Sequence, residues 1–245
     1  MIDELLGPPD ADWDYLFGGL VLGRAVEAAT AHAPDGRRMH SLHAYFLRPV
    51  RATSPVDYRI VPLREGRSFA THRLDASQDG KDVFTMTCSY TADTDGYDYD
   101  VLRATPLPPR DESTAEPGPG PWESVRLGPT PPDEHGVRAS THRHWFRIPY
   151  RLPDDAHVHA ALLAFASDWT DLGARPLQLE GDTNGIVSLD HAVWFHRPAR
   201  ADQWLFFDVQ SLVNAGGRGL LRAVMRDENG NVVASVAQEL LLAVV

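Results

Sequence analysis

The stretch SLDHAVWFHRP (188–198) has a shorter counterpart, SLHAYFLRP, at residues 41–49. Each stretch ends in Arg-Pro and is followed by a strand-like segment. A polar turn then lies between two alternating or β-branched segments, QDGK in the first copy and ENGN in the second. Such a turn is typical of a β-hairpin. Both copies therefore predict a strand followed by a hairpin.

The spacing of these features indicates an internal duplication. From Pro49 to Gly80 is 31 residues, and from Pro198 to Gly230 is 32. An Arg-Pro pair followed by a hairpin turn at nearly the same distance is unexpected by chance, so we interpret the two copies as structural repeats.

A proline-rich segment separates the copies. Nine of the nineteen prolines lie at residues 104–136, which excludes a helix or a central strand because proline fixes φ and lacks an amide donor. We expect a linker or a crossover on the surface. The predicted organisation is a unit at 1–103, this linker, and a second unit at 137–245.

One helical segment precedes the strands of each unit. In FGGLVLGRAVEAATAH (17–32) small and apolar residues follow helical spacing, as they do in DDAHVHAALLAFASDWTDLG (154–173). Asp154 or Asp155 can cap the second helix, and Gly173 can end it. This pattern predicts an α+β fold in which two antiparallel sheets each wrap around a helix.

Composition restricts the class of protein. Hydrophobic residues make up 43% of the 245 residues, enough for a folded core, and the net charge of −11 argues against nucleic acid as a partner. Cys88, the single cysteine, lies among apolar residues and is expected in the core. The N-terminus is unlike a secretory signal, and no apolar run is long enough to span a bilayer. We therefore expect a soluble, cytoplasmic protein.

Five motifs in order resemble the acyl-CoA thioesterase II family: FGGLVLGRAVEAA, HSLHAYFLRPV, HAALLAFASDW, SLDHAVWFHRP and ASVAQE. The resemblance covers almost everything from Phe17 to Glu239 except the linker. It implies a double hot-dog fold, a role in lipid metabolism, and hydrolysis of acyl-CoA to free acid and coenzyme A without a cofactor. Only sixteen residues precede Phe17, where this family usually has an additional strand. The first unit thus either lacks an edge strand or has that edge covered by a partner subunit, and we expect a homo-oligomer.

The resemblance also implies three catalytic residues: Asp168 in AFASDW, Ser188 at the start of SLDHAVWFHRP, and Gln238 in SVAQE. Asp168 would lie mid-helix on an apolar segment, where an unpaired acid is costly. Gln238 would be a lone polar residue in an apolar strand. Ser188 is the weaker candidate, because serines are frequent at strand starts and in turns. In the first half, Ser89 aligns with Gln238, and the helix has Gly-Gly where a carboxylate would be wanted. We therefore expect one site per chain.

The histidines do not form a metal motif. His191 and His196 are five residues apart, and His40 and His43 are three apart, so in a strand the members of each pair point to opposite faces. The same alternation argues against a dyad of Asp190 with His191. We expect neutral, hydrogen-bonded histidines.

The two Arg-Pro arginines, Arg48 and Arg197, could pair with carboxylates or contact coenzyme A phosphates, as could Arg64, Arg67 and Arg218. Their occurrence in both halves favours a structural role.

Other functions remain open on the sequence. A non-catalytic module that binds acyl-CoA or an acyl carrier would use the same pocket. A hot-dog hydratase would need a D-x-N-P-x-H arrangement, which the chain lacks. The identity of the acyl group is not indicated.

Overall fold

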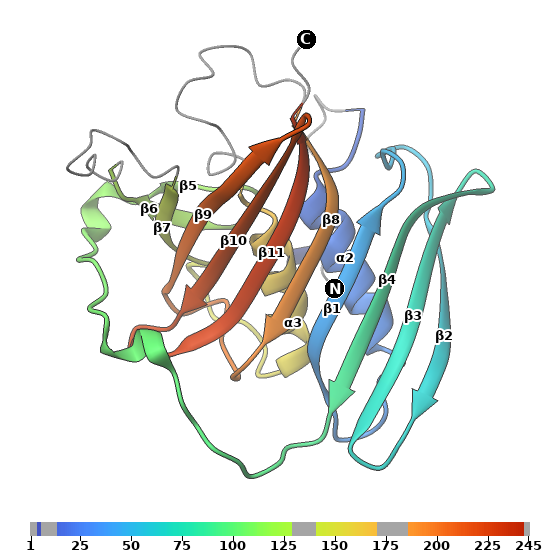
Figure 1. Ribbon diagram of the computed structural model, residues 1–245, viewed down its shortest axis with the longest axis horizontal. Coiled ribbons are helices and arrows are strands. Elements are labelled where there is room, and N and C mark those ends of the chain that lie inside the picture. The colour runs from blue at the N-terminus through green and yellow to red at the C-terminus, as the bar shows by residue number, and fades with distance from the viewer. Residues whose placement is uncertain (1–3, 6–13, 129–140, 171–185, 243–245) are drawn as a thin grey trace.

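The computed structural model describes residues 4–5, 14–128, 141–170 and 186–242 (Figure 1). The first half contains α2 (Gly18–Thr30), β1 (Arg38–Phe46), β2 (Asp57–Glu65), β3 (Phe69–Gln78) and β4 (Lys81–Thr91). The segment between the halves contains β5 (Glu116–Pro117) and β6 (Glu123–Arg126). The second half contains β7 (Thr141–Arg147), α3 (Ala156–Ser167), β8 (Ile186–Phe195), β9 (Leu205–Ala215), β10 (Arg218–Arg226) and β11 (Val232–Leu242).

The strands form one antiparallel sheet in the order β2-β3-β4-β1-β8-β11-β10-β9-β7-β6-β5. From β2 to β9, replacing each strand by its counterpart in the other half gives the same order read from the opposite end. The predicted duplication requires this symmetry. The two sheets predicted for the two halves are continuous as one sheet, because β1 pairs with β8 from Ser41↔Trp194 to Tyr45↔Asp190. In each half alone, β1 or β8 would be an edge strand with unpaired backbone groups. The pairing of β1 with β8 provides hydrogen-bond partners for both strands.

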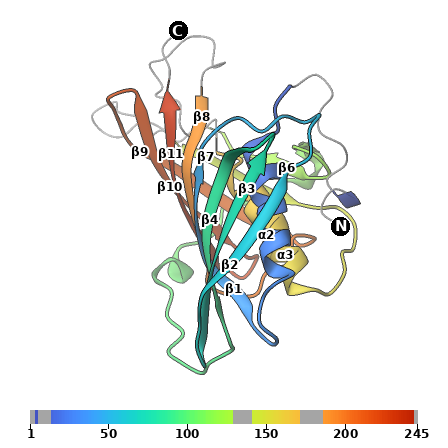
Figure 2. The same cartoon turned by 90° about the vertical axis from the view of Figure 1, so that its right-hand side faces the viewer.

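The two helices pack together on one face of the sheet (Figure 2). They approach closely at Gly19, where an added Cβ would lie 2.4 Å from the Phe165 carbonyl oxygen. Phe17 packs edge-on against the Phe165 ring, 5.4 Å between centroids. A continuous core joins both helices to the buried face of the sheet and contains Cys88, as predicted. The two halves thus share one core.

Both predicted hairpin turns are present. Asp79 and Gly80 link β3 to β4 with φ of 52° and 73°, and Gly230 lies between β10 and β11 with φ of 84°. These values explain the glycines, because other residues rarely adopt positive φ.

The segment predicted as a linker contributes to the sheet. β6 pairs with β7, and Trp122 beside it is buried and stacks near Phe165, at 6.4 Å between centroids. Prolines exclude a central strand, but Pro117 lies in the edge strand β5, where a missing amide donor is tolerated, and β6 contains no proline.

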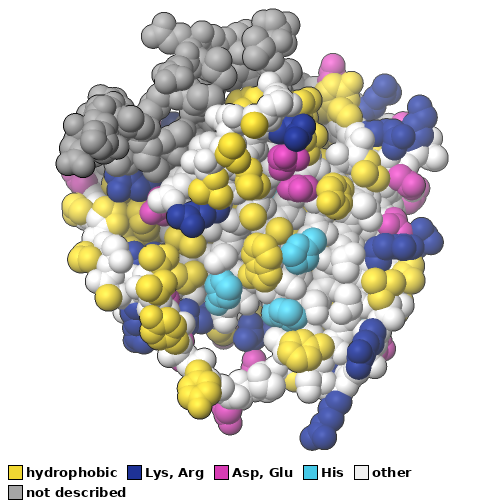
Figure 3. All heavy atoms as spheres, in the orientation of Figure 1, with side chains coloured by type: hydrophobic (Ala, Val, Ile, Leu, Met, Phe, Trp, Pro, Cys, Tyr) yellow, Lys and Arg dark blue, Asp and Glu magenta, His cyan; other side chains and the backbone are white. Residues whose placement is uncertain are grey.

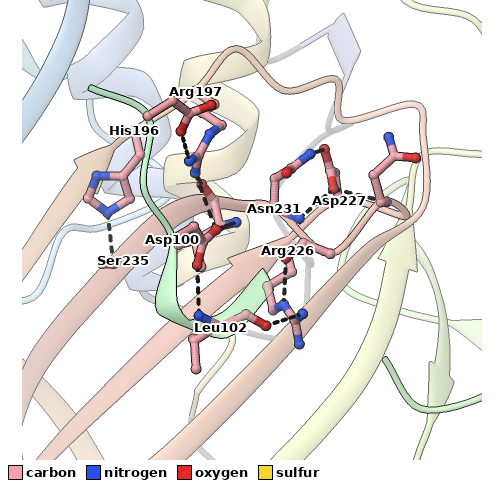
Figure 4. A network of polar contacts seen from close by, with 12 residues as sticks. Asp100, Leu102, His196, Arg197, Arg226, Asp227, Asn231 and Ser235 are labelled. Carbon is pink, nitrogen blue, oxygen red and sulfur yellow. Dashed lines mark hydrogen bonds and ion pairs between the residues drawn. The ribbon is translucent and has the colours of Figure 1, made fainter. Parts of the chain in front are cut away.

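Residues 98–105 are held to the second half by a polar network (Figure 4). Asp100 accepts a hydrogen bond from the Val232 amide (2.6 Å). Buried Arg226 donates Nη2 to the carbonyls of Leu102 and Thr105, both at 2.7 Å. The crossover is therefore anchored at its start to the β10–β11 hairpin.

The two Arg-Pro arginines make equivalent contacts. Arg48 donates to the carbonyl of Asp82, and Arg197 donates to the carbonyl of Val232 (2.6 Å), each at the start of its half's last strand. Arg197 also pairs with Asp98 and Asp100. These contacts agree with the structural role expected of both residues.

The described N-terminal residues form no strand ahead of α2. A single bridge joins Tyr15 to Arg51, whereas β7 precedes α3 in the second half. This difference agrees with a first half that lacks an edge strand, although residues 6–13 lie outside the described part.

The sheet face opposite the helices is open in the single chain. Histidine side chains gather around hydrophobic ones in the middle of this face (Figure 3). Exposed Tyr45 and Trp194 lie on the paired strands β1 and β8, and His43 packs edge-on against Trp194 at 5.2 Å. Among the described residues, no helix is long and apolar enough to cross a membrane.

Candidate active site

The site begins where α3 ends. Asp155 caps the start of this helix and accepts a hydrogen bond from the His157 amide (2.8 Å), as predicted. The helix was expected to continue to Gly173, but its last residue is Ser167 and Asp168 is the C-cap. Trp169 and Thr170 form a turn in which the Thr170 amide donates to the Asp168 carbonyl (2.8 Å).

The correction follows from local chemistry and core packing. Asp, Trp and Thr are weak helix formers, and Trp169 leaves the helical path to pack against His144, 4.5 Å between ring centroids. Gly173 lies outside the described residues. Asp168 is therefore not a mid-helix residue, and its side chain reaches from the helix end toward the sheet.

The three predicted residues meet at Asp168 Oδ1. Ser188 Oγ donates to it at 3.1 Å and Gln238 Nε2 at 2.5 Å. Gln238 Nε2 also donates to Ser188 Oγ at 2.8 Å. The side chains come from the end of α3 and from the paired strands β8 and β11. Asp168 and Gln238 are only 4% and 1% exposed, so this carboxylate and amide are withdrawn from bulk water.

Thr170 was not among the residues predicted for the site. Its Oγ1 donates to Gln238 Oε1 at 2.6 Å. With Oε1 engaged as an acceptor, the amide nitrogen must point toward Asp168 and Ser188, so Thr170 sets the orientation of the amide. The sequence holds one weak signal, a hydroxyl residue two positions after Asp168.

His191 lies behind the carboxylate. Its Nδ1 is 3.8 Å from Asp168 Oδ1, and its Nε2 is 2.7 Å from Ser167 Oγ. The Ser167 hydroxyl donates to the Ala164 carbonyl (2.7 Å), so we assign the imidazole proton to Nε2, which donates to Ser167. Burial lowers the pKa of His191 to about 3, which keeps it neutral as predicted. His191 is thus a neutral neighbour of the site and supplies no positive charge.

The first half contributes Gly18, the first residue of α2. A Cβ on Gly18 would lie 2.6 Å from Asp168 Oδ2, so only glycine permits this approach. We expected the Gly-Gly pair to occupy the position in α2 that corresponds to Asp168 in α3. Instead the pair begins α2, whereas Asp168 lies at the C-terminal end of α3. Consecutive glycines are costly in a helix and indicate close contact. The positive end of the α2 dipole is favourable for the Asp168 carboxylate.

The counterpart of Gln238 in the first half is Cys88 rather than Ser89. Gln238 pairs with buried His191, and Cys88 pairs with buried Leu42 in the same position of the other half. The halves differ in register by one residue here, and a shift of one residue moves a side chain to the opposite face. Ser89 instead contacts His40 Nε2 at 2.9 Å.

His40, His43 and His196 do not contact these site residues. His191 is buried, whereas His196 is exposed and contacts Ser235 Oγ at 2.8 Å, so these two face opposite sides as predicted. His40 and His43 do not, because a register shift between Met39 and Ser41 leaves both off the buried face. No group of His, Cys, Asp and Glu among the described residues could hold a metal ion.

Comparison with known proteins decides the family. The model for the acyl-CoA thioesterase C-terminal domain matches residues 101–242, more than half of the chain, and the N-terminal domain model matches residues 9–91. The chain belongs to the acyl-CoA thioesterase II family. It is accordingly a thioester hydrolase by family, as its motifs predicted.

Relatives agree along nearly the whole chain. Acyl-CoA thioesterase 2 of Haemophilus influenzae is 28% identical over 98% of this chain and 93% of its own. Human acyl-coenzyme A thioesterase 8 is 29% identical over 91% of this chain and 79% of its own. The crystal structure of an acyl-CoA thioesterase II, TesB2, from Mycobacterium marinum is 33% identical with a TM-score of 0.82, covering 98% and 97% of the two chains. A hot-dog protein from Alicyclobacillus acidocaldarius, 19% identical with a TM-score of 0.74 over 96% and 90%, shows the fold alone.

Proposed function

We propose that the chain hydrolyses acyl-CoA to free acid and coenzyme A with a water molecule that Asp168, Ser188 and Gln238 position and activate. The observation that carries this proposal is the convergence of two side-chain donors on Asp168 Oδ1. A buried carboxylate held by an amide and a hydroxyl is suited to orient a water and take its proton. The donors also stabilise the negative charge that a base needs.

The reaction needs no covalent intermediate. Asp168 takes a proton from water as the water oxygen bonds to the thioester carbonyl carbon. The tetrahedral intermediate then collapses, the C–S bond breaks, and the leaving thiolate receives the proton from Asp168. Ser188 and Gln238 hold the water, and neutral His191 adds no positive charge beside the carboxylate.

Comparison of matching positions in the two halves supports one site per chain. We interpret the sheet as two hot-dog units, 1–103 and 137–245, joined by the 104–136 linker, although β5 and β6 of that linker extend the second unit. At the first half's positions matching Asp168 and Gln238 the chain has Ala31, the C-cap of α2, and Cys88. Neither can serve as a carboxylate base or an amide. A cytoplasmic homo-oligomer that acts in lipid metabolism remains the prediction.

A thiol-release assay over a panel of acyl-CoA thioesters tests the proposal. Wild-type protein should release coenzyme A from at least one chain length, and Asp168→Asn prepared in parallel controls for contaminating activity. The alternative, a module that binds acyl-CoA or an acyl carrier without hydrolysis, would show saturable binding with no thiol released. That result would overturn the proposed function.

A further inference from the structure

A cavity lies at the opposite end of α3 from Asp168. Its volume is about 450 Å³, and it is lined by the first residues of α3 and the start of β1. Ala156 and Ala160 lie on the helix side, and Arg38 and Met39 on the strand side. This volume is within the range of about 300–1,000 Å³ typical of small-molecule sites.

The internal repeat relates this cavity to the active site. The Arg-Pro motifs align Pro49 with Pro198, 149 positions apart, and the same offset aligns Met39 with Ser188. Met39 lines the cavity, and Ser188 belongs to the site.

Two more pairs agree. Gly18 and Ala156 are the first residues of α2 and α3. Gly18 approaches Asp168, and Ala156 lines the cavity. Phe46, whose ring lies 3.4 Å from a Cβ built on Gly18, aligns with Phe195 in the cavity wall. The cavity is therefore the counterpart of the active site under exchange of the two halves, without its carboxylate and amide.

The walls of the cavity suit an amphiphile. One side is apolar, formed by Met39, Leu163 and Phe195. The other side contains Arg200, which Asp202 holds through two hydrogen bonds of 2.9 Å and which also pairs with Asp154 (2.7 Å), a carboxylate that is 94% exposed. Such exposed pairs contribute little, so a ligand carboxylate can replace Asp154. The α3 N-terminus adds a partial positive charge.

His159 provides a buried donor at the cavity. It is 3% exposed, and its Nδ1 accepts a hydrogen bond from the Ala201 amide (3.1 Å), which assigns the proton to Nε2. Burial and the nearby Arg200 lower the pKa of His159, whereas Asp202, the Pro153 carbonyl and Asp154 raise it. No acceptor among the described residues meets hydrogen-bond geometry with Nε2–H. An unpaired buried donor points to a missing acceptor.

The remaining acids at the rim are engaged. Asp227 accepts hydrogen bonds from the Asn229 and Asn231 amides, at 3.0 and 2.8 Å. Glu228 pairs with Arg110 at 2.9 Å. These carboxylates are therefore held in place by partners on their own side of the rim.

We propose that this cavity binds a free fatty acid of medium chain length. The carboxylate accepts from His159 Nε2–H and pairs with Arg200, and the alkyl chain lies along the apolar wall. The ligand is of the same chemical class as the acid that the thioesterase releases, so the link to turnover rests on the proposed function, whereas binding itself does not.

Methyl-labelled methionine gives a direct test with decanoate as the probe. Met39, Met86 and Met225 are all buried, but Met39 lines the cavity, whereas Met86 and Met225 do not and serve as internal controls. Sub-millimolar decanoate should shift the Met39 methyl resonance saturably and leave the other two unchanged. Decylammonium, with the same chain and opposite charge, should not. An unmoved Met39 resonance, or an equal response to decylammonium, would overturn the proposal.

Two variants complete the test. Ala160→Phe fills the cavity and should abolish the decanoate response while kcat and KM for acyl-CoA stay unchanged. If that variant fails to fold, His159→Phe removes the donor and should weaken decanoate binding at least about tenfold. A response that persists in a folded variant of either kind would refute the site. Absence of thioesterase activity in the wild-type protein would refute the proposed function, and the decanoate-binding result would still stand.

Discussion

Asp168 is the residue on which the proposed chemistry depends. Asp168→Asn should fold and bind acyl-CoA, because the amide is nearly isosteric, but kcat should fall by ~10²–10⁴-fold, the typical contribution of a positioned base. Ser188→Ala and Gln238→Ala should each cost less, and neither should add much to Asp168→Asn, since the three act on one water. Steady-state thiol release measures all of these. A folded Asp168→Asn enzyme within a few-fold of wild type would remove Asp168 from the mechanism.

Thr170 should act only through Gln238. Thr170→Val keeps the shape of the side chain but removes the 2.6 Å hydrogen bond that orients the amide. We expect kcat to fall by about tenfold with KM little changed. In the Gln238→Ala background the same substitution should have no further effect on kcat, and full additivity of the two would contradict a positioning role.

His191 should make stability depend on pH. Its folded-state pKa of about 3 lies below the ordinary value near 6.5, so the unfolded chain binds more protons between these values. Its contribution to stability is therefore present above about pH 6.5 and is lost as pH falls toward 3, by at most about 1.4 kcal/mol per pH unit. Leu42, the counterpart in the first half, shows that an apolar residue suits such a position.

Urea unfolding of wild type and His191→Leu at pH 5 and pH 7.5 measures this contribution. The variant should lose less stability than wild type between the two pH values. Equal losses would show that His191 does not titrate in this window.

At the scale of elements, Arg226 holds the crossover to the β10–β11 hairpin. Arg226→Met leaves the carbonyls of Leu102, Thr105 and Gly230 without their donor, and should lower the free energy of unfolding by about 2–4 kcal/mol. Arg222→Met is the matched control. Arg222 is on the same strand, and its side-chain hydrogen bonds to described residues are exposed ones to Gln210, so its loss should cost under about 0.5 kcal/mol. Similar urea midpoints for the two variants would contradict the anchoring role.

At the scale of the whole molecule, the open sheet face bears on assembly. Tyr45 and Trp194 occupy equivalent positions in the two repeats, and both are exposed, 58% and 37%. Exposed aromatic residues on a sheet face often mark an interaction surface. We expect a homo-oligomer by light scattering at micromolar concentration, and Trp194→Glu should shift it toward the 27.1 kDa monomer. A monomeric wild type would contradict the expectation.

The sequence alone indicated the repeat, its hairpins and three residues that the structure brings together, because hydrophobic alternation, turn glycines and ordered motifs are local signals. Only the tertiary structure decided that both halves form a single sheet, since the β1–β8 pairing joins residues about 150 positions apart. It also decided that α3 ends at Ser167, because packing of Trp169 overrides helical periodicity. The positions of Thr170, Gly18 and Cys88 relative to the site were also visible only in the tertiary structure. Each depends on a contact or a one-residue register shift across the fold, and such information is absent from the neighbouring sequence.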